Sequence, residues 1–197
     1  GRRERDLAKR YRTTSRQTAS AIEWQYRFSW KDIERIRSKF DIPLILKGIA
    51  TAEDAQMAVE HGIDVIYASN HGGRQLDHGR GGIDTLPEIV DAAGDNADVM
   101  IDGGFMRGGD IVKAMALGAD AVGLGRLQGL ALGAGGRAAV VRMLEILEIE
   151  IRICMGLLGV TSYDELTVDH LHQVPAVELP HPLSAFPLLY EDYLNEE

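Results

Sequence analysis

The sequence predicts an α/β fold in which helices cover both faces of a parallel sheet. Its short apolar runs are continuous rather than alternating, as expected for strands that are buried on both faces. These runs alternate with helical patterns along the chain. Residues 54–66 also resemble residues 110–122, which indicates a repeated strand-helix-strand unit. Such repetition favours a β/α barrel, and an open sheet is the alternative.

The elements follow in order. Apolar spacing predicts a helix over 31–40 and a strand over 43–47. Thr51 is a suitable N-cap for a helix over 51–60, which ends before Gly62, and a strand follows at 65–68. The next pairs are helix 86–93 with strand 99–101, and helix 110–117 with strand 121–124.

The remainder divides into an N-terminal loop (1–30), the strand and helix region (31–135) and a C-terminal part (136–197). A long helix is predicted over 136–158, and a short one near 162–166. Prolines over 174–197 preclude regular structure, so this tail is expected to wrap over a surface or reach a neighbouring subunit.

The composition is that of one folded domain: 197 residues, 45% hydrophobic, with a net charge of −9 when histidine is neutral. This charge argues against nucleic acid as a partner. The basic segment 2–16 is interpreted as a solvent-exposed loop in which one or two arginines have a functional role. A segment that binds nucleic acid is the alternative. A lone cysteine, Cys154, excludes a disulfide scaffold and favours a reducing, cytoplasmic setting. No signal peptide, membrane span or metal site is expected.

Charged and polar residues and glycines, which a hydrophobic core does not require, follow the predicted strands. In a β/α barrel the active site lies at these strand ends. Lys47 would place a fixed positive charge beside a group that becomes anionic on reduction, unless it is a surface lysine. His71 can take a proton, and Arg74 can grip a carboxylate. The alternative is a structural turn in which the hydrogen-bonding groups of His71 are already paired within the protein. Glycines after the last two strands, with Arg126, resemble a phosphate site.

Four motifs occur in a fixed order: Leu46-Lys47-Gly48, Ser69-Asn70-His71-Gly72-Gly73-Arg74-Gln75-Leu76-Asp77, Asp102-Gly103-Gly104 and Gly125-Arg126. With them the sequence resembles the FMN-dependent α-hydroxy acid oxidase/dehydrogenase family, which includes glycolate oxidase, lactate oxidase, mandelate dehydrogenase and flavocytochrome b2. The resemblance implies a (β/α)8 TIM barrel, of which this chain covers strands five to eight and the C-terminal helices and tail.

The resemblance also implies an activity: FMN-dependent oxidation of a 2-hydroxy acid of the lactate, glycolate or mandelate type to the 2-oxo acid. His71 would be the base, and Arg74 and Arg3 would bind the carboxylate. Lys47 would lie beside the flavin N1/O2 edge. The remaining cofactor contacts would be Ser69, Asp102, Gly103, Gly104, Gly125 and Arg126. The electron acceptor would be oxygen, a quinone or a cytochrome, and the assembly a homotetramer or larger.

The chain departs from the family pattern at two positions. Met106 replaces a phosphate-binding arginine, so Arg107 or a backbone N–H is expected to substitute for it, and Leu127 replaces a common proline. The catalytic aspartate that partners the histidine lies upstream in the family.

Two further alternatives follow from the resemblance. A half-barrel that is inactive, or that requires a partner, could bind a phosphate-bearing ligand without turnover. A diphosphate isomerase on an FMN barrel is disfavoured because it has no carboxylate to grip. Residues 11–28 are expected to form a short loop, with membrane contact as the less favoured interpretation.

Overall fold

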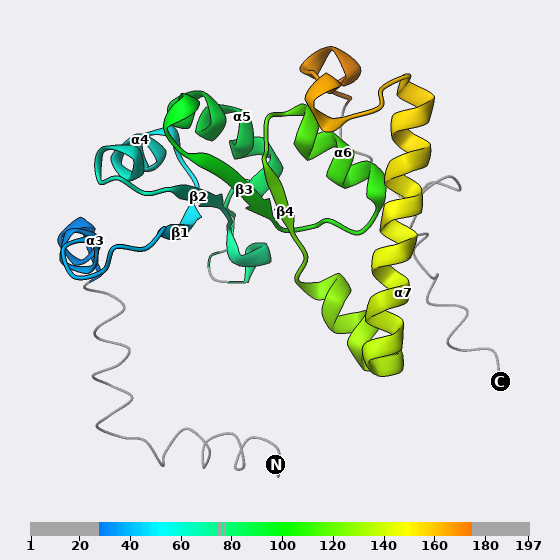
Figure 1. Ribbon diagram of the computed structural model, residues 1–197, viewed down its shortest axis with the longest axis horizontal. Helices are drawn as coiled ribbons and strands as arrows, with labels where there is room; N and C mark the ends of the chain where they lie inside the picture. Colours follow the sequence, from blue (N-terminus) through cyan, green and yellow to red (C-terminus); the bar gives the residue numbers. More distant parts are fainter. Residues whose placement is uncertain (1–27, 75, 77, 175–197) are drawn as a thin grey trace, which may run out of the picture.

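The computed structural model describes residues 28–74, 76 and 78–174, which form a four-stranded parallel sheet with flanking helices (Figure 1). The strands are β1 (Ile45–Ile49), β2 (Val65–Ala68), β3 (Asp98–Asp102) and β4 (Ala121–Gly123), and they pair in the order of the sequence. The connecting helices are α4 (Ala52–Glu60), α5 (Gly82–Ala93) and α6 (Gly108–Ala116). A sheet whose strands pair in sequence order is the arrangement that a β/α barrel requires.

Further helices flank this unit. Helix α3 (Trp30–Arg37) precedes β1, and α7 (Arg126–Leu158) follows β4. Single 3-10 turns are η1 (His71–Gly73), η2 (Gly94–Asn96), η3 (Tyr163–Glu165) and η4 (Val168–His170). Among the described helices, none is both long enough and apolar enough to cross a membrane.

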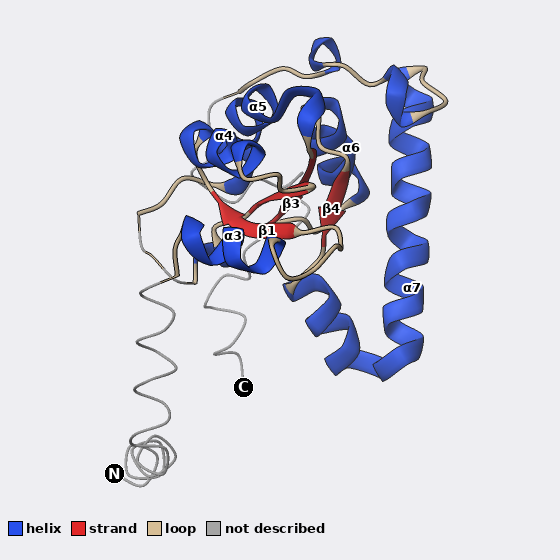
Figure 2. Cartoon of the chain, turned by 60° about the vertical axis from the view of Figure 1, so that its left-hand side comes forward, coloured by secondary structure: helices blue, strands red, loops and turns tan. Residues whose placement is uncertain are grey.

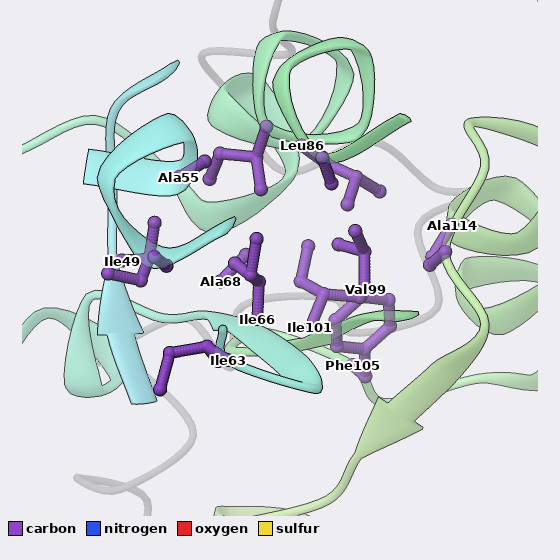
Figure 3. Close-up of a cluster of buried hydrophobic side chains, with 14 of the residues drawn as sticks. Ile49, Ala55, Ile63, Ile66, Ala68, Leu86, Val99, Ile101, Phe105 and Ala114 are labelled. Carbon is purple, nitrogen blue, oxygen red and sulfur yellow. The ribbon is translucent and has the colours of Figure 1, made fainter. Parts of the chain in front are cut away.

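The hydrophobic core lies between one face of the sheet and helices α4 and α5, which lie together on one side of the strands (Figure 2). In Figure 3, strand side chains point toward Ala55 of α4 and Leu86 of α5. The strand residues are Ile49, Ile66, Ala68, Val99 and Ile101. Because side chains alternate along a strand, Lys47, Tyr67 and Asp102 project from the opposite face.

The two segments that resemble each other in sequence, 54–66 and 110–122, also make equivalent contacts with the backbone. The Asp64 carboxylate accepts the Leu44 N–H at 2.8 Å, and the Asp120 carboxylate accepts the Val99 N–H at 2.7 Å. Each aspartate therefore fastens the start of its own strand to the start of the preceding one. The pKa of Asp64 is lowered, chiefly by this backbone hydrogen bond and then by Arg37.

Several element boundaries differ from the sequence predictions for tertiary reasons. Strand β1 continues to Ile49, so Lys47 is not its last residue; the register shifts at Gly48, whose φ of 106° suits glycine. Helix α5 begins at Gly82 rather than residue 86. A Cβ at Gly82 would lie 3.0 Å from the carbonyl oxygen of Asp102, so this glycine permits the helix to approach β3.

The C-terminal helix is longer than predicted. It begins at Arg126, and its helical geometry is interrupted at Gly135 and Gly136, where the second segment begins as predicted. The basic segment 2–16, which includes Arg3, and residues 175–197 of the proline-rich tail lie outside the described residues.

Candidate functional site

A cavity of about 540 Å³ opens at the carboxyl ends of the strands, within the size range of small-molecule sites. Segments from all four strand ends contribute to it, as the sequence predicts. The lining residues are Lys47, His71, Gly72, Arg74, Asp102, Gly103, Gly104, Phe105, Met106, Gly123, Gly125, Arg126 and Leu127. The structure thus brings together eight of the predicted site residues, and Ser69 lies directly behind them.

A cluster of three polar side chains lies at the floor of this cavity: Lys47 and Asp102 line it, and Ser69 lies behind them. The Ser69 hydroxyl donates to the Asp102 carboxylate at 2.5 Å and accepts from Lys47 Nζ at 2.7 Å. Lys47 Nζ also lies 2.8 Å from the second Asp102 oxygen. The Lys47 side chain remains 45% exposed whereas Ser69 is buried. The cluster therefore holds an ammonium in a defined place while leaving it open to the cavity.

Tyr67 is a member of this cluster that the sequence analysis missed, because it occurs within an apolar strand. Lys47 Nζ lies 4.6 Å from the centre of its ring. Burial raises the pKa of the Tyr67 phenol, and the neighbouring Asp102 carboxylate raises it further. The position of Tyr67 in its strand could have identified it, because β1 and β2 pair so that Tyr67 lies opposite Lys47.

The turn that carries His71 is fixed by its own backbone and by Ser69. The His71 N–H donates to the Ser69 hydroxyl at 3.1 Å, and the Asn70 side chain accepts the Gly73 N–H at 3.1 Å. His71 has a φ of 56°, in the left-handed region that non-glycine residues rarely adopt. Such backbone conformations cluster at functional sites, and this one presents His71 and Arg74 to the same cavity.

The other end of the cavity is suited to an anion. Gly104 and Gly125 border open space, since a Cβ at either position would meet nothing within 4 Å. Helix α7 begins at Arg126, so its N-terminus faces the cavity and favours negative charge. The Arg126 guanidinium donates to the Gly72 carbonyl oxygen, which connects this end to the His71 turn.

Arg107 is a predicted site residue that the structure does not bring into the cavity. Its Nε donates to the Glu150 carboxylate of α7 at 2.8 Å, and its terminal nitrogen lies 2.6 Å from the same oxygen. This pairing occupies the guanidinium that was expected to replace the arginine missing at Met106. Met106 and Leu127 themselves line the cavity.

The described residues fit a flavin mononucleotide. Lys47, Arg74 and Arg126 make the cavity cationic, and the glycine backbones at its far end leave room for a phosphate. Phe105, Met106 and Leu127 add apolar surface for a ring system. His71 and Arg74 line the same cavity; an imidazole can accept a proton and a guanidinium can bind a carboxylate.

Comparison with known proteins agrees with this description. The family described as FMN-dependent dehydrogenase matches residues 2–173. An L-lactate oxidase from Nostoc sp. is 44% identical over 144 residues, which are 73% of this chain and 40% of that protein. A peroxisomal (S)-2-hydroxyacid oxidase from Arabidopsis thaliana is 46% identical over 144 residues. The chain spans about 40% of the length of these curated relatives.

Solved structures give the same result. Mandelate oxidase with benzoyl-formic acid aligns with a TM-score of 0.68 and 47% identity, over 70% of this chain and 41% of that one. A mandelate oxidase mutant with the monooxide FMN adduct aligns equally well, over 44% of its length. The predicted fold class, an α/β chain that forms part of a (β/α)8 barrel, is confirmed by the parallel sheet and these alignments.

Proposed function

Because the chain belongs to the FMN-dependent dehydrogenase family, we propose that it oxidises a 2-hydroxy acid to the 2-oxo acid with FMN as its cofactor. The observation that carries this proposal is the arrangement of one cavity: His71 and Arg74 lie on the same turn, and Lys47 lines the same space. A base, a carboxylate clamp and a fixed cation are the groups that this oxidation needs.

Each residue has a separate task in the proposed reaction. Arg74 holds the substrate carboxylate through parallel hydrogen bonds, with Arg3 as a second clamp that lies outside the described residues. His71 accepts one of the two protons that leave the substrate. FMN, when bound, would take up the two electrons and the other proton that the hydroxy acid loses.

The cofactor would be held from both ends of the cavity. Lys47, kept in place by Ser69 and Asp102, supplies positive charge at the flavin edge. Gly103, Gly104, Gly125 and Arg126 surround the space for the phosphate.

Oxygen is the acceptor that we propose, because the curated relatives are named oxidases. The substrate would be of the lactate, glycolate or mandelate type. Catalysis in the presence of air would then release hydrogen peroxide, which a coupled peroxidase assay detects. Reduction of a quinone or cytochrome without peroxide would contradict this choice of acceptor. A homotetramer or larger assembly and a cytoplasmic location stay predictions.

The test of the reaction is anaerobic bleaching of the FMN absorbance by glycolate, lactate or mandelate. We expect His71→Asn to bind FMN normally and to slow bleaching by about 10²- to 10⁴-fold, the range for loss of a general base. His172→Asn is the matched control, because His172 is exposed and does not line the cavity. Unchanged bleaching in His71→Asn would remove this residue from the reaction.

A second candidate is a half-barrel that binds a phosphate-bearing ligand without turnover. The supporting observation is the end of the cavity that suits an anion, where Gly104 and Gly125 border open space beside the N-terminus of α7. This alternative predicts FMN binding without bleaching by any of the three acids. Bleaching by one of them would exclude it.

A further inference from the structure

The face of the sheet below the cavity carries a row of side chains, of which the proposed reaction uses only Lys47. Tyr67 on β2 pairs with Lys47 on β1 and with Met100 on β3, so all three side chains project from one face. Lys47 reaches upward from this row to Ser69 and Asp102. Tyr67 therefore lies beneath the groups that form the floor of the cavity.

The Tyr67 side chain spans the space between β2 and β4. A Cβ at Gly123 would overlap the Tyr67 hydroxyl and would lie 3.3 Å from Asp102 Cβ. Glycine at this position of β4 is what permits the phenol to reach so far. The ring is thereby held below the Asp102 carboxylate, and the Lys47 ammonium lies 4.6 Å from its centre.

This geometry gives the Lys47 ammonium three contacts of different kinds. Asp102 provides an ion pair, Ser69 accepts a hydrogen bond, and the Tyr67 ring offers its electron-rich face. The first two draw the ammonium toward β3 and the end of β2. The ring lies beneath it, so loss of the ring would let the flexible lysine side chain move away from the position that faces the cavity.

We propose that Tyr67 is a positioning residue: its ring, seated in the space left by Gly123, holds the Lys47 ammonium where it stabilises negative charge on a bound flavin. This inference rests on the proposed function for the identity of the ligand. It assigns to a strand residue outside the cavity lining a part in setting the reduction potential of the cofactor.

The experiment measures the midpoint potential of the FMN-loaded protein with a chemical reductant. Tyr67→Leu removes the ring, and we expect a roughly tenfold loss in preference for the reduced flavin, which is a shift of about −30 mV for a two-electron couple. Tyr67→Phe keeps the ring face and should retain the potential of the unsubstituted protein. Tyr163→Leu is the control, since Tyr163 lies on η3 and does not line the cavity.

Two further measurements separate positioning from packing. Fluorinated phenylalanines at position 67 weaken the ring face without changing the fold, so the potential should fall with each added fluorine. In a Lys47→Met background, Tyr67→Leu should produce no further shift, because the group that it positions is gone. A purely structural tyrosine would lower thermal stability and leave the potential unchanged.

The outcomes distinguish this inference from the proposed function. Normal FMN binding with equal potentials in Tyr67→Leu and the unsubstituted protein would overturn the inference alone. A shifted potential without oxidation of any hydroxy acid would support the inference and overturn the proposed reaction. Failure of the unsubstituted protein to bind FMN would overturn both.

Discussion

Glu150 connects the long C-terminal helix to the unit that forms the cavity, and its replacement is the sharpest test of this packing. Its carboxylate accepts the Gly108 N–H at the start of α6 at 2.7 Å and pairs with Arg107 at 2.6 Å. The Glu150 side chain is 21% exposed, against 49% for Arg107. A carboxylate from α7 thus caps α6, the helix that follows the Gly103 and Gly104 backbone of the site.

The expected cost of Glu150→Ala follows from these contacts. Loss of a helix-capping acceptor costs about 1 kcal/mol. The ion pair adds about 1 kcal/mol at most, because Arg107 is half exposed and solvent screens the interaction. We therefore expect a loss of about 2 kcal/mol, which lowers the melting temperature by about 4–8 °C in a domain of this size. Glu150→Gln retains an acceptor and should cost about half as much.

The pH dependence of this loss provides a second measurement. Burial by itself raises the pKa of Glu150, but hydrogen bonds from Arg107 and the Gly108 N–H outweigh it and bring the pKa below its ordinary value of 4.5. A carboxyl group with a lowered pKa in the folded state stabilises the protein above pH 4.5. This contribution disappears as the pH falls through the lowered value.

The assay is thermal unfolding followed by circular dichroism at neutral pH and in acid. The difference in melting temperature between the unsubstituted protein and Glu150→Ala should shrink in acid. A difference below about 1 °C at neutral pH would refute the assigned capping contact. Arg107→Ala should leave the affinity for FMN within about twofold, well under 1.4 kcal/mol, and a tenfold loss would return Arg107 to the phosphate site.

Three other predictions concern single positions. Met106→Arg adds a guanidinium to the cavity, and fluorescence titration should show FMN binding about tenfold tighter or more; no gain would place the phosphate elsewhere. Gly108→Ala should cost about 3 kcal/mol in urea unfolding, since its Cβ would lie 2.6 Å from a backbone nitrogen of α7, whereas Gly109→Ala, with open space, should cost nothing. Asp120→Ala leaves the Val99 N–H without its carboxylate, so we expect a loss of about 1–3 kcal/mol and faster hydrogen exchange at that amide.

Local patterns predicted the elements whose boundaries depend on neighbouring residues in the chain. The strand over 65–68 occurs as predicted, and Thr51 caps α4 by accepting the Asp54 N–H. The strand depends on a continuous apolar run. The N-cap depends on a side chain that accepts a hydrogen bond from the backbone of its own helix. The structure also brings Lys47, His71 and Arg126 to one cavity, because parallel strands of a barrel end at the same rim.

Contacts between distant segments could not be read in this way. Gly82 is at the start of a helix because it passes close to Asp102, and Arg107 pairs with the Glu150 carboxylate of α7 rather than lining the cavity. Nothing within a few residues of either position signals its partner.

The amino-acid sequence by itself therefore determined the fold class, the family and the edge of the sheet at which the cavity lies. All three follow from periodicity and from short motifs, which are local. The tertiary structure decided which charged groups face the cavity and which pair elsewhere. That choice depends on distances between groups far apart in the chain, as when Tyr67 comes to lie beneath Lys47 and Arg107 is drawn to α7.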